Sequence, residues 1–176
     1  MKKTATLIMA ATIALGGTAI AQEQKKPLSP PMTATGTIAG SNVTVNYSAP
    51  SVRGRKIMGE LVPYGQVWRT GANAATTLET DANLMIGDLS VPKGKYTLFT
   101  LPAEDGWTLI VNKQTGQWGT NYDASKDLGR VKMKVNALAS PVETMTIDVA
   151  EKEKGKGKLR IAWENTEAWV PVTLAK

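Results

Sequence analysis

Residues 145–163 have the sequence MTIDVAEKEKGKGKLRIAW, and this stretch carries the pattern that decides the fold. Apolar residues alternate with polar ones on both sides of its lysine- and glycine-rich centre, at Met145, Ile147, Val149, Leu159, Ile161 and Trp163. A period of two places successive side chains on opposite faces of a strand, so one face of each run is apolar. The centre, residues 154–158, predicts an exposed hairpin tip whose charges disfavour pairing with another sheet edge. The stretch therefore predicts two antiparallel strands that cover a core.

The same alternation recurs along the chain, in residues 43–48, 96–99, 107–111, 131–135 and 170–174. Turn signals such as VPKG and EDG recur about every ten residues, a spacing typical of antiparallel sandwiches and barrels. No stretch keeps the 3.6-residue period of an amphipathic helix. We therefore predict an all-β fold. It is a single-domain antiparallel β-sandwich over residues 35–176, with a jelly-roll-like or barrel-like arrangement as the alternative.

The first 21 residues have the features of a bacterial Sec-type signal peptide. Lys2 and Lys3 precede a short apolar stretch at residues 6–15, and small residues, Ala19 and Ala21, stand where signal peptidase recognises them. The apolar stretch is too short to cross a bilayer, which takes about 20 residues. No cysteine follows it, so a thiol-linked lipid anchor is excluded. We predict cleavage after Ala21, leaving a periplasmic or secreted protein without a transmembrane anchor.

Residues 22–34 follow the predicted cleavage point and contain three prolines and few apolar residues. Such a composition is typical of a flexible segment rather than of a packed element. We therefore predict a flexible N-terminal lead-in here, before the sandwich domain.

Composition excludes several kinds of chemistry. None of the 176 residues is histidine or cysteine, which removes a Ser-His-Asp triad, a cysteine nucleophile, a disulfide and a conventional structural zinc site. We predict no cofactor and no metal, and we favour a protein that is not an enzyme. Cleavage would remove two lysines and no acidic residue, so the formal net charge would fall from +6 to +4. A charge of this size gives no reason to expect a nucleic-acid partner.

One region interrupts the strand pattern. Residues 50–77, PSVRGRKIMGELVPYGQVWRTGANAATT, show no clean alternation and carry four cations against the single acid Glu60. Residues 57–61 are compatible with one short helical turn that ends at Pro63. Long irregular segments inside a compact domain are uncommon and often functional. We therefore predict that the functional site lies in this segment.

The same region carries a resemblance to a known family. The strings YSAPSVRGR (47–55), GELVPYGQVWRTGAN (59–73), PKGKYTL (92–98), NKQTGQWG (112–119) and LGRV (128–131) resemble the DUF2911 family. The resemblance extends over about residues 34–174. It implies an exported bacterial protein with the predicted fold, and it implies no reaction, because the family's function is unknown. One position departs from the pattern: Ala74 stands where the family often has Glu, so a carboxylate available to relatives is missing here.

The predicted ligand-binding residues are Arg53, Arg55, Trp68, Arg69, Thr70, Asn73 and Trp118. The arginines offer rigid sets of donors suited to carboxylate or phosphate, and the neighbouring Gly71 lets backbone N–H groups approach a ligand. An exposed indole can stack on a sugar or another flat apolar surface. The alternative is a purely structural loop, in which Arg69 binds carbonyl groups, Trp68 fills the core and Asn73 stabilises a turn. The tryptophans inside alternating runs, Trp107 and Trp163, are expected in the core.

Two further patterns carry weaker hypotheses. Asn121, Asp123, Ser125 and Asp127 occupy alternate positions, as in the first half of a calcium loop, but lysines replace the later glycine and glutamate, and turn chemistry explains the same residues. A hydrolase would need two facing carboxylates, and no spacing selects a pair among the acids considered, which are Glu60, Glu79, Asp81, Asp105, Asp123 and Asp148.

Three functional hypotheses remain. The preferred one is an exported β-sandwich that binds a small or extended ligand, anionic or sugar-like, through residues 50–77. The alternatives are a carboxylate-dependent hydrolase of envelope polymers and an envelope structural or interaction protein, whose protein partner is unknown.

Overall fold

A computed structural model describes residues 27–175 of the chain. The predicted signal peptide and the first residues of the predicted lead-in lie outside the described residues. Among those that are described, no helix is both long enough and apolar enough to cross a membrane.

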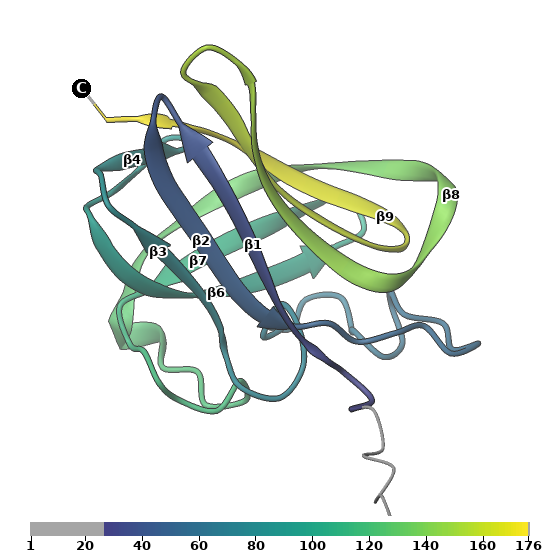
Figure 1. Cartoon of the computed structure of the whole chain (residues 1–176). Coiled ribbons are helices and arrows are strands. Elements are labelled where there is room, and N and C mark those ends of the chain that lie inside the picture. The colour runs from purple at the N-terminus through teal and green to yellow at the C-terminus, as the bar shows by residue number, and fades with distance from the viewer. Residues whose placement is uncertain (1–26, 176) are drawn as a thin grey trace, which may run out of the picture.

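The described chain is almost entirely β-structure, which confirms the predicted all-β class (Figure 1). Its strands are β1 (Pro31–Ile38), β2 (Ser41–Ser48), β3 (Thr76–Thr80), β4 (Leu84–Ile86), β5 (Leu89–Val91), β6 (Gly94–Ala103), β7 (Gly106–Asn112), β8 (Asp127–Glu153) and β9 (Lys156–Leu174), with one 3₁₀ turn, η1 (Ala124–Lys126). All neighbouring strands are antiparallel, in the order β1-β2-β3-β6-β7-β8-β9-β4-β5. β1 and β5 are the two edge strands of this order and do not pair with each other. The sheet is therefore not closed, and the barrel-like alternative is wrong.

The sheet folds over on itself through its two longest strands. The first part of β8 pairs with β7, and the part from Lys134 onward pairs with β9, which in turn carries β4 and β5. The β8–β9 register shifts on both sides of Val142, opposite Glu164, whose φ of 53° is left-handed. Figure 1 shows that β8 bends along its length before a hairpin leads into β9. The sequence predicted separate runs at 131–135 and 145–149, and the structure joins them in one bent strand.

The edge strand β1 closes the second layer against β8. Gly36 makes this possible, because a Cβ there would lie 2.8 Å from the carbonyl carbon of Val149. The predicted domain start at residue 35 falls inside β1, which begins four residues earlier. Pro31 pairs with Ser48 of β2, and proline is tolerated as the first residue of an edge strand because it needs no ladder donor there.

The core lies between the folded layers and contains the expected apolar faces. Trp107 and Trp163 are each only 2% exposed, which confirms their prediction as core residues. The alternation expected at residues 96–99 is wrong, because β6 is buried on both faces from Tyr96 to Thr100. The segment after β7 covers its second face: Phe99 contacts the ring of Tyr122 edge-on, with centroids 4.8 Å apart.

The chain between β2 and β3 is irregular, as predicted, although β3 already begins at Thr76. It makes isolated bridges to the sheet at Ser51↔Thr144 and Trp68↔Thr100. Residues 57–61 form a hydrogen-bonded turn rather than the expected helical turn, with the Val62 N–H donating to the Ile57 carbonyl over 2.9 Å. The turn is wider than a turn of α-helix, because its closing hydrogen bond joins residues five apart instead of four.

Glu164 anchors this turn from β9. Its two carboxylate oxygens accept hydrogen bonds from the backbone N–H groups of Ile57 and Met58, each at 3.3 Å. The bent strand and the irregular segment are therefore coupled, and together they position the walls of the cleft described next.

Candidate functional site: a cationic cleft

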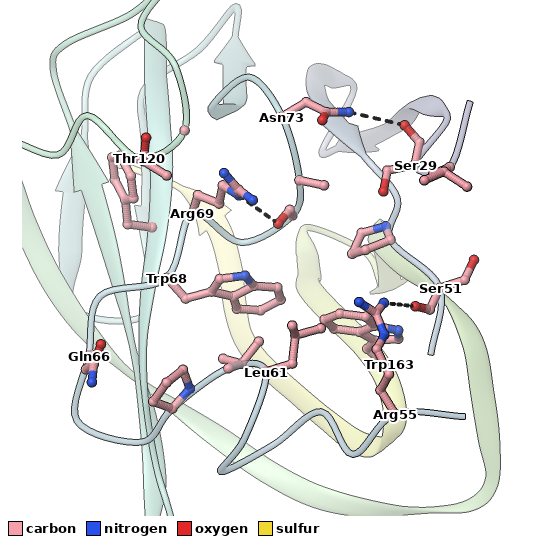
Figure 2. Close-up of a pocket in the computed structure, with 18 of the residues that line it drawn as sticks. Ser29, Ser51, Arg55, Leu61, Gln66, Trp68, Arg69, Asn73, Thr120 and Trp163 are labelled. Carbon is pink, nitrogen blue, oxygen red and sulfur yellow. Dashed lines mark hydrogen bonds between the residues drawn. The ribbon is translucent and has the colours of Figure 1, made fainter. Parts of the chain in front are cut away.

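A cleft of about 820 Å³ opens between the irregular segment and the sheet (Figure 2). Residues 27–29 form one wall, and Gly119, Thr120 and Tyr122 form another. Residues from the irregular segment supply most of the lining, while Phe99 of β6 and Trp163 of β9 contribute from the sheet. The volume lies within the range of small-molecule sites, which is about 300–1,000 Å³.

Three arginines line the cleft, and none of their guanidinium groups pairs with a carboxylate of a described residue. The Glu143 carboxylate accepts from the backbone N–H of Arg53, at 2.9 Å, and not from its guanidinium group. Arg53, Arg55 and Arg69 all belong to the lining, and within residues 27–175 no aspartate or glutamate does. None of the three makes a salt bridge to a described residue. The other two arginines of the chain do: Arg130 pairs with a carboxylate at 3.0 Å and Arg160 at 2.7 Å. The cleft therefore concentrates uncompensated positive charge.

Neutral carbonyl groups orient two of these guanidinium groups. Arg55 donates from Nη2 to the Ser51 carbonyl at 2.7 Å and from Nε to the Val52 carbonyl at 3.0 Å. Arg69 donates from Nε to the Gly71 carbonyl at 3.4 Å. Neither Nη group of Arg69 has a hydrogen-bond partner among the described residues, so these donors are available to a ligand. Carbonyl groups fix a guanidinium in place without neutralising its charge.

The backbone of the irregular segment is strained at three positions. Arg53, Thr70 and Asn73 have φ values of 50°, 53° and 57°, in the left-handed region. That conformation costs most residues with a Cβ about 1–2 kcal/mol; asparagine, as at Asn73, tolerates it best, and it is least favourable for a β-branched residue such as Thr70. Strain of this kind clusters at functional sites, where surrounding contacts hold it.

Thr70 itself faces away from the cleft. It is fully buried, and its hydroxyl donates to the Thr100 hydroxyl over 3.2 Å. The Thr70 carbonyl accepts from the Thr76 hydroxyl at 2.8 Å. Thr70 therefore holds the strained turn that presents Arg69, and the structure does not place it among the lining residues.

Trp68 lines the cleft and also packs against the hydrophobic core. Its ring stacks on Trp163 with centroids 5.8 Å apart and meets Trp107 edge-on at 6.1 Å. Its backbone exchanges two hydrogen bonds with Thr100, at 2.7 and 2.9 Å. The indole is thus held rigidly, and Figure 2 shows it between Arg69 and Leu61.

Trp118 does not join the other predicted residues. It is 53% exposed, bridges the backbone of Ala74 and does not line the cleft. Its neighbour Gly119 does, and a Cβ there would lie 2.5 Å from Cδ of Arg69 and 2.7 Å from the Asn73 carbonyl oxygen. Gly119 was not predicted as a site residue, although it belongs to the NKQTGQWG stretch at residues 112–119. Ala74, where the family often has Glu, is exposed and also lies outside the lining.

The wall at residues 27–29 was also missed. Arg53 donates from Nη2 to the Leu28 carbonyl, and Asn73 donates from Nδ2 to the Ser29 carbonyl at 3.4 Å. Two of the predicted binding residues therefore hold part of the predicted lead-in against the cleft. Composition alone could not reveal this, because the contacts are made by backbone carbonyl groups.

The residues with calcium-loop spacing make local contacts instead. Asp123 caps η1: its Oδ1 accepts from the Ser125 hydroxyl at 2.7 Å and the Ser125 N–H at 2.9 Å, which lowers the pKa of Asp123. Asp127 accepts from the Tyr122 hydroxyl at 2.7 Å and from Arg130. Burial first, and then the contact with Asp127, raises the pKa of Tyr122. Turn and capping contacts thus account for these residues.

None of the acids considered for hydrolysis lines the cleft. Glu60 and Glu79 pair with exposed lysines, Asp148 pairs with Arg160, and Asp81 accepts from Asn42. Within the described residues no group of three His, Cys, Asp or Glu is arranged to hold a metal ion.

Fold and cleft together define an all-β protein with an open, folded-over sheet and a cationic cleft beside one edge of its core. The family follows from comparison of the sequence: the chain belongs to DUF2911, described as a protein of unknown function, whose family model matches residues 29–172. No curated protein and no solved structure matches the chain.

Proposed function

We propose that this protein binds a small anionic molecule in the cleft formed by the irregular segment. The observation that carries the proposal is the set of three arginines that line one cleft with no acidic residue among the lining and no salt bridge to a described carboxylate. Elsewhere in the described chain, both remaining arginines are paired with carboxylates. An anion would supply the missing partner for Arg53, Arg55 and Arg69.

The energetics favour an anion with carboxylate or phosphate oxygens. Charge-assisted hydrogen bonds contribute about 1.5–3 kcal/mol each, and the planar guanidinium matches both groups in a two-pronged contact. Arg69 is the best placed, because both of its Nη groups lack partners among residues 27–175 and its side chain is held against Gly119. A sugar carrying an acidic group would also fit, with its apolar face on Trp68.

A thermal-shift screen of residues 22–176 tests the proposal with a panel of organic anions, inorganic phosphate and uncharged sugars. A ligand at 100 times its dissociation constant stabilises a fold by about 2.7 kcal/mol. Arg69→Gln should weaken binding of an anionic hit by about ten- to one-hundredfold, the equivalent of one charge-assisted bond. Lys132→Gln is the control, since it removes the same charge from the exposed face of β8.

The outcome is decisive in both directions. An anionic hit that is lost in Arg69→Gln and kept in Lys132→Gln supports the proposal. A hit that weakens equally in both variants reports only general electrostatic attraction and contradicts a specific site. Silence of the whole panel shifts the assignment to the interaction-protein hypothesis.

A further inference from the structure

The cleft gathers exposed apolar side chains as well as arginines. The large apolar side chains exposed on the described chain are Leu28, Met32, Leu61, Tyr64, Val67 and Trp118. Three of these line the cleft: Leu28, 70% exposed, Leu61, 46%, and Val67, 37%. Exposed apolar residues scattered singly need no explanation, whereas a cluster at a concave site indicates a contact surface.

Charge and apolar surface alternate within this cluster. Arg53 donates to the carbonyl of Leu28, and Val67 stands two residues before Arg69. In Figure 2 the Trp68 indole separates Arg69 from Leu61. A ligand that meets an arginine here therefore also meets apolar surface, which a hydrated inorganic ion would leave uncovered.

We infer that the ligand is an amphiphilic anion: a carboxylate joined to an alkyl chain or aromatic ring. This inference rests on the proposed function and names the class of ligand that the same site takes. The head group contacts Arg69, whose Nη groups have no partner among residues 27–175, and the apolar part covers Trp68 and Leu61, which Figure 2 shows beside it. A small molecule is the occupant, rather than a protein surface, because the site is a cleft of about 820 Å³ lined by residues 27–29, by the irregular segment and by residues that follow β7.

The experiment is a calorimetric titration of residues 22–176 with straight-chain carboxylates from butyrate to decanoate, each kept below its micelle concentration. Affinity should rise about fourfold for each added methylene, the value expected for burying that group. Octylamine has the octanoate-length chain with the opposite charge and should bind at least tenfold more weakly than octanoate.

Two apolar variants locate the contact. Leu61→Ser should flatten the dependence on chain length, whereas Met32→Ser should leave it unchanged. Met32 is a matched control, since it is also 46% exposed and lies outside the cleft. Both side chains are half in solvent, so neither variant should prevent folding. Arg69→Gln should weaken binding of every carboxylate in the series.

The failures of the two ideas are distinguishable. Equal affinity from butyrate to decanoate overturns the amphiphilic ligand, while phosphate or succinate binding that Arg69→Gln abolishes would still support the anion site. Octylamine binding as tightly as octanoate overturns both, and so does the absence of any anion binding sensitive to Arg69→Gln. Binding to anionic lipid vesicles without binding of monomeric octanoate overturns the inference in favour of a membrane surface.

Discussion

The contact between β1 and β8 depends on Gly36, and Gly36→Ala tests how tightly the sheet is closed. The added Cβ would lie 2.8 Å from the Val149 carbonyl carbon, with the carbonyl oxygen closer still. Real Cβ atoms essentially never approach another heavy atom within 3.0 Å. Both obstructing atoms are backbone and cannot rotate aside, so the two strands must separate by about 1 Å.

The expected cost follows from the packing. Forcing a methyl group into a close-packed contact costs about 1–3 kcal/mol. Separation also loosens the neighbouring Ile38, which is fully buried and whose complete truncation would cost about 2–5 kcal/mol. Alanine also lowers the conformational entropy of the unfolded chain, which offsets about 0.4–1 kcal/mol of this loss in stability. We expect a net loss of about 2–3 kcal/mol in the free energy of unfolding, a decrease in Tm of about 4–12 °C for a domain of this size.

Urea unfolding followed by tryptophan fluorescence measures the loss, with calorimetry for Tm. Gly129→Ala is the matched control: it also adds a Cβ to a strand, but the three atoms nearest to that Cβ belong to the Leu89 side chain, which can turn away, and not to backbone. The control should lose less than about 1 kcal/mol. Equal losses in the two variants, or wild-type stability in Gly36→Ala, would refute the close backbone contact.

Three further predictions concern the cleft, the loop beside it and an ion pair of the sheet. Gly119→Ala should weaken anion binding about tenfold by displacing Arg69, with a loss of stability below about 2 kcal/mol, measured by calorimetric titration and urea unfolding. Asn73→Val should cost about 1–2 kcal/mol through its left-handed φ, whereas Asn73→Gly should stay within about 0.5 kcal/mol; similar losses in both would show that strain is not the cause. The hydrogen bond from Arg160 lowers the pKa of Glu167 below 4.5, so its contribution to stability is present above that pH and is lost as pH falls through the lower, folded pKa. Glu167→Gln should therefore reduce the dependence of the urea midpoint on pH below about 4.5, and an unchanged dependence would contradict the assignment.

The features that could be predicted from the sequence depend on contacts between residues close together in the chain, and the features that could not depend on contacts between distant segments. Strand alternation is local, so the all-β class and the buried Trp107 and Trp163 followed from the sequence. The double burial of β6 did not, because a distant segment that packs against Phe99 covers its second face. The bend in β8 opposite Glu164 was also not predictable, since it depends on pairing between strands rather than on either strand alone.

The site shows the same division. Local composition identified the irregular segment, and five of its candidates, Arg53, Arg55, Trp68, Arg69 and Asn73, do line one cleft. Thr70 and Trp118 do not, because a residue's position in a loop does not fix the side on which its side chain lies. The wall formed by residues 27–29 depends on backbone carbonyl groups, which every residue possesses and no motif distinguishes.

The treatment of arginine in this fold is itself an argument for a ligand. Where arginine serves the sheet, as at Arg160, two carboxylates surround it, and Arg130 has a carboxylate and a tyrosine hydroxyl. The guanidinium groups of the three cleft arginines donate only to carbonyl groups, on a backbone that is left-handed at Arg53 and at Thr70 next to Arg69. A segment selected only for packing would avoid both the unneutralised charge and the strain, since each lowers stability without a compensating contact. Binding of an anion would neutralise the arginine charge. The left-handed backbone would then serve to hold the arginines rigidly for that anion.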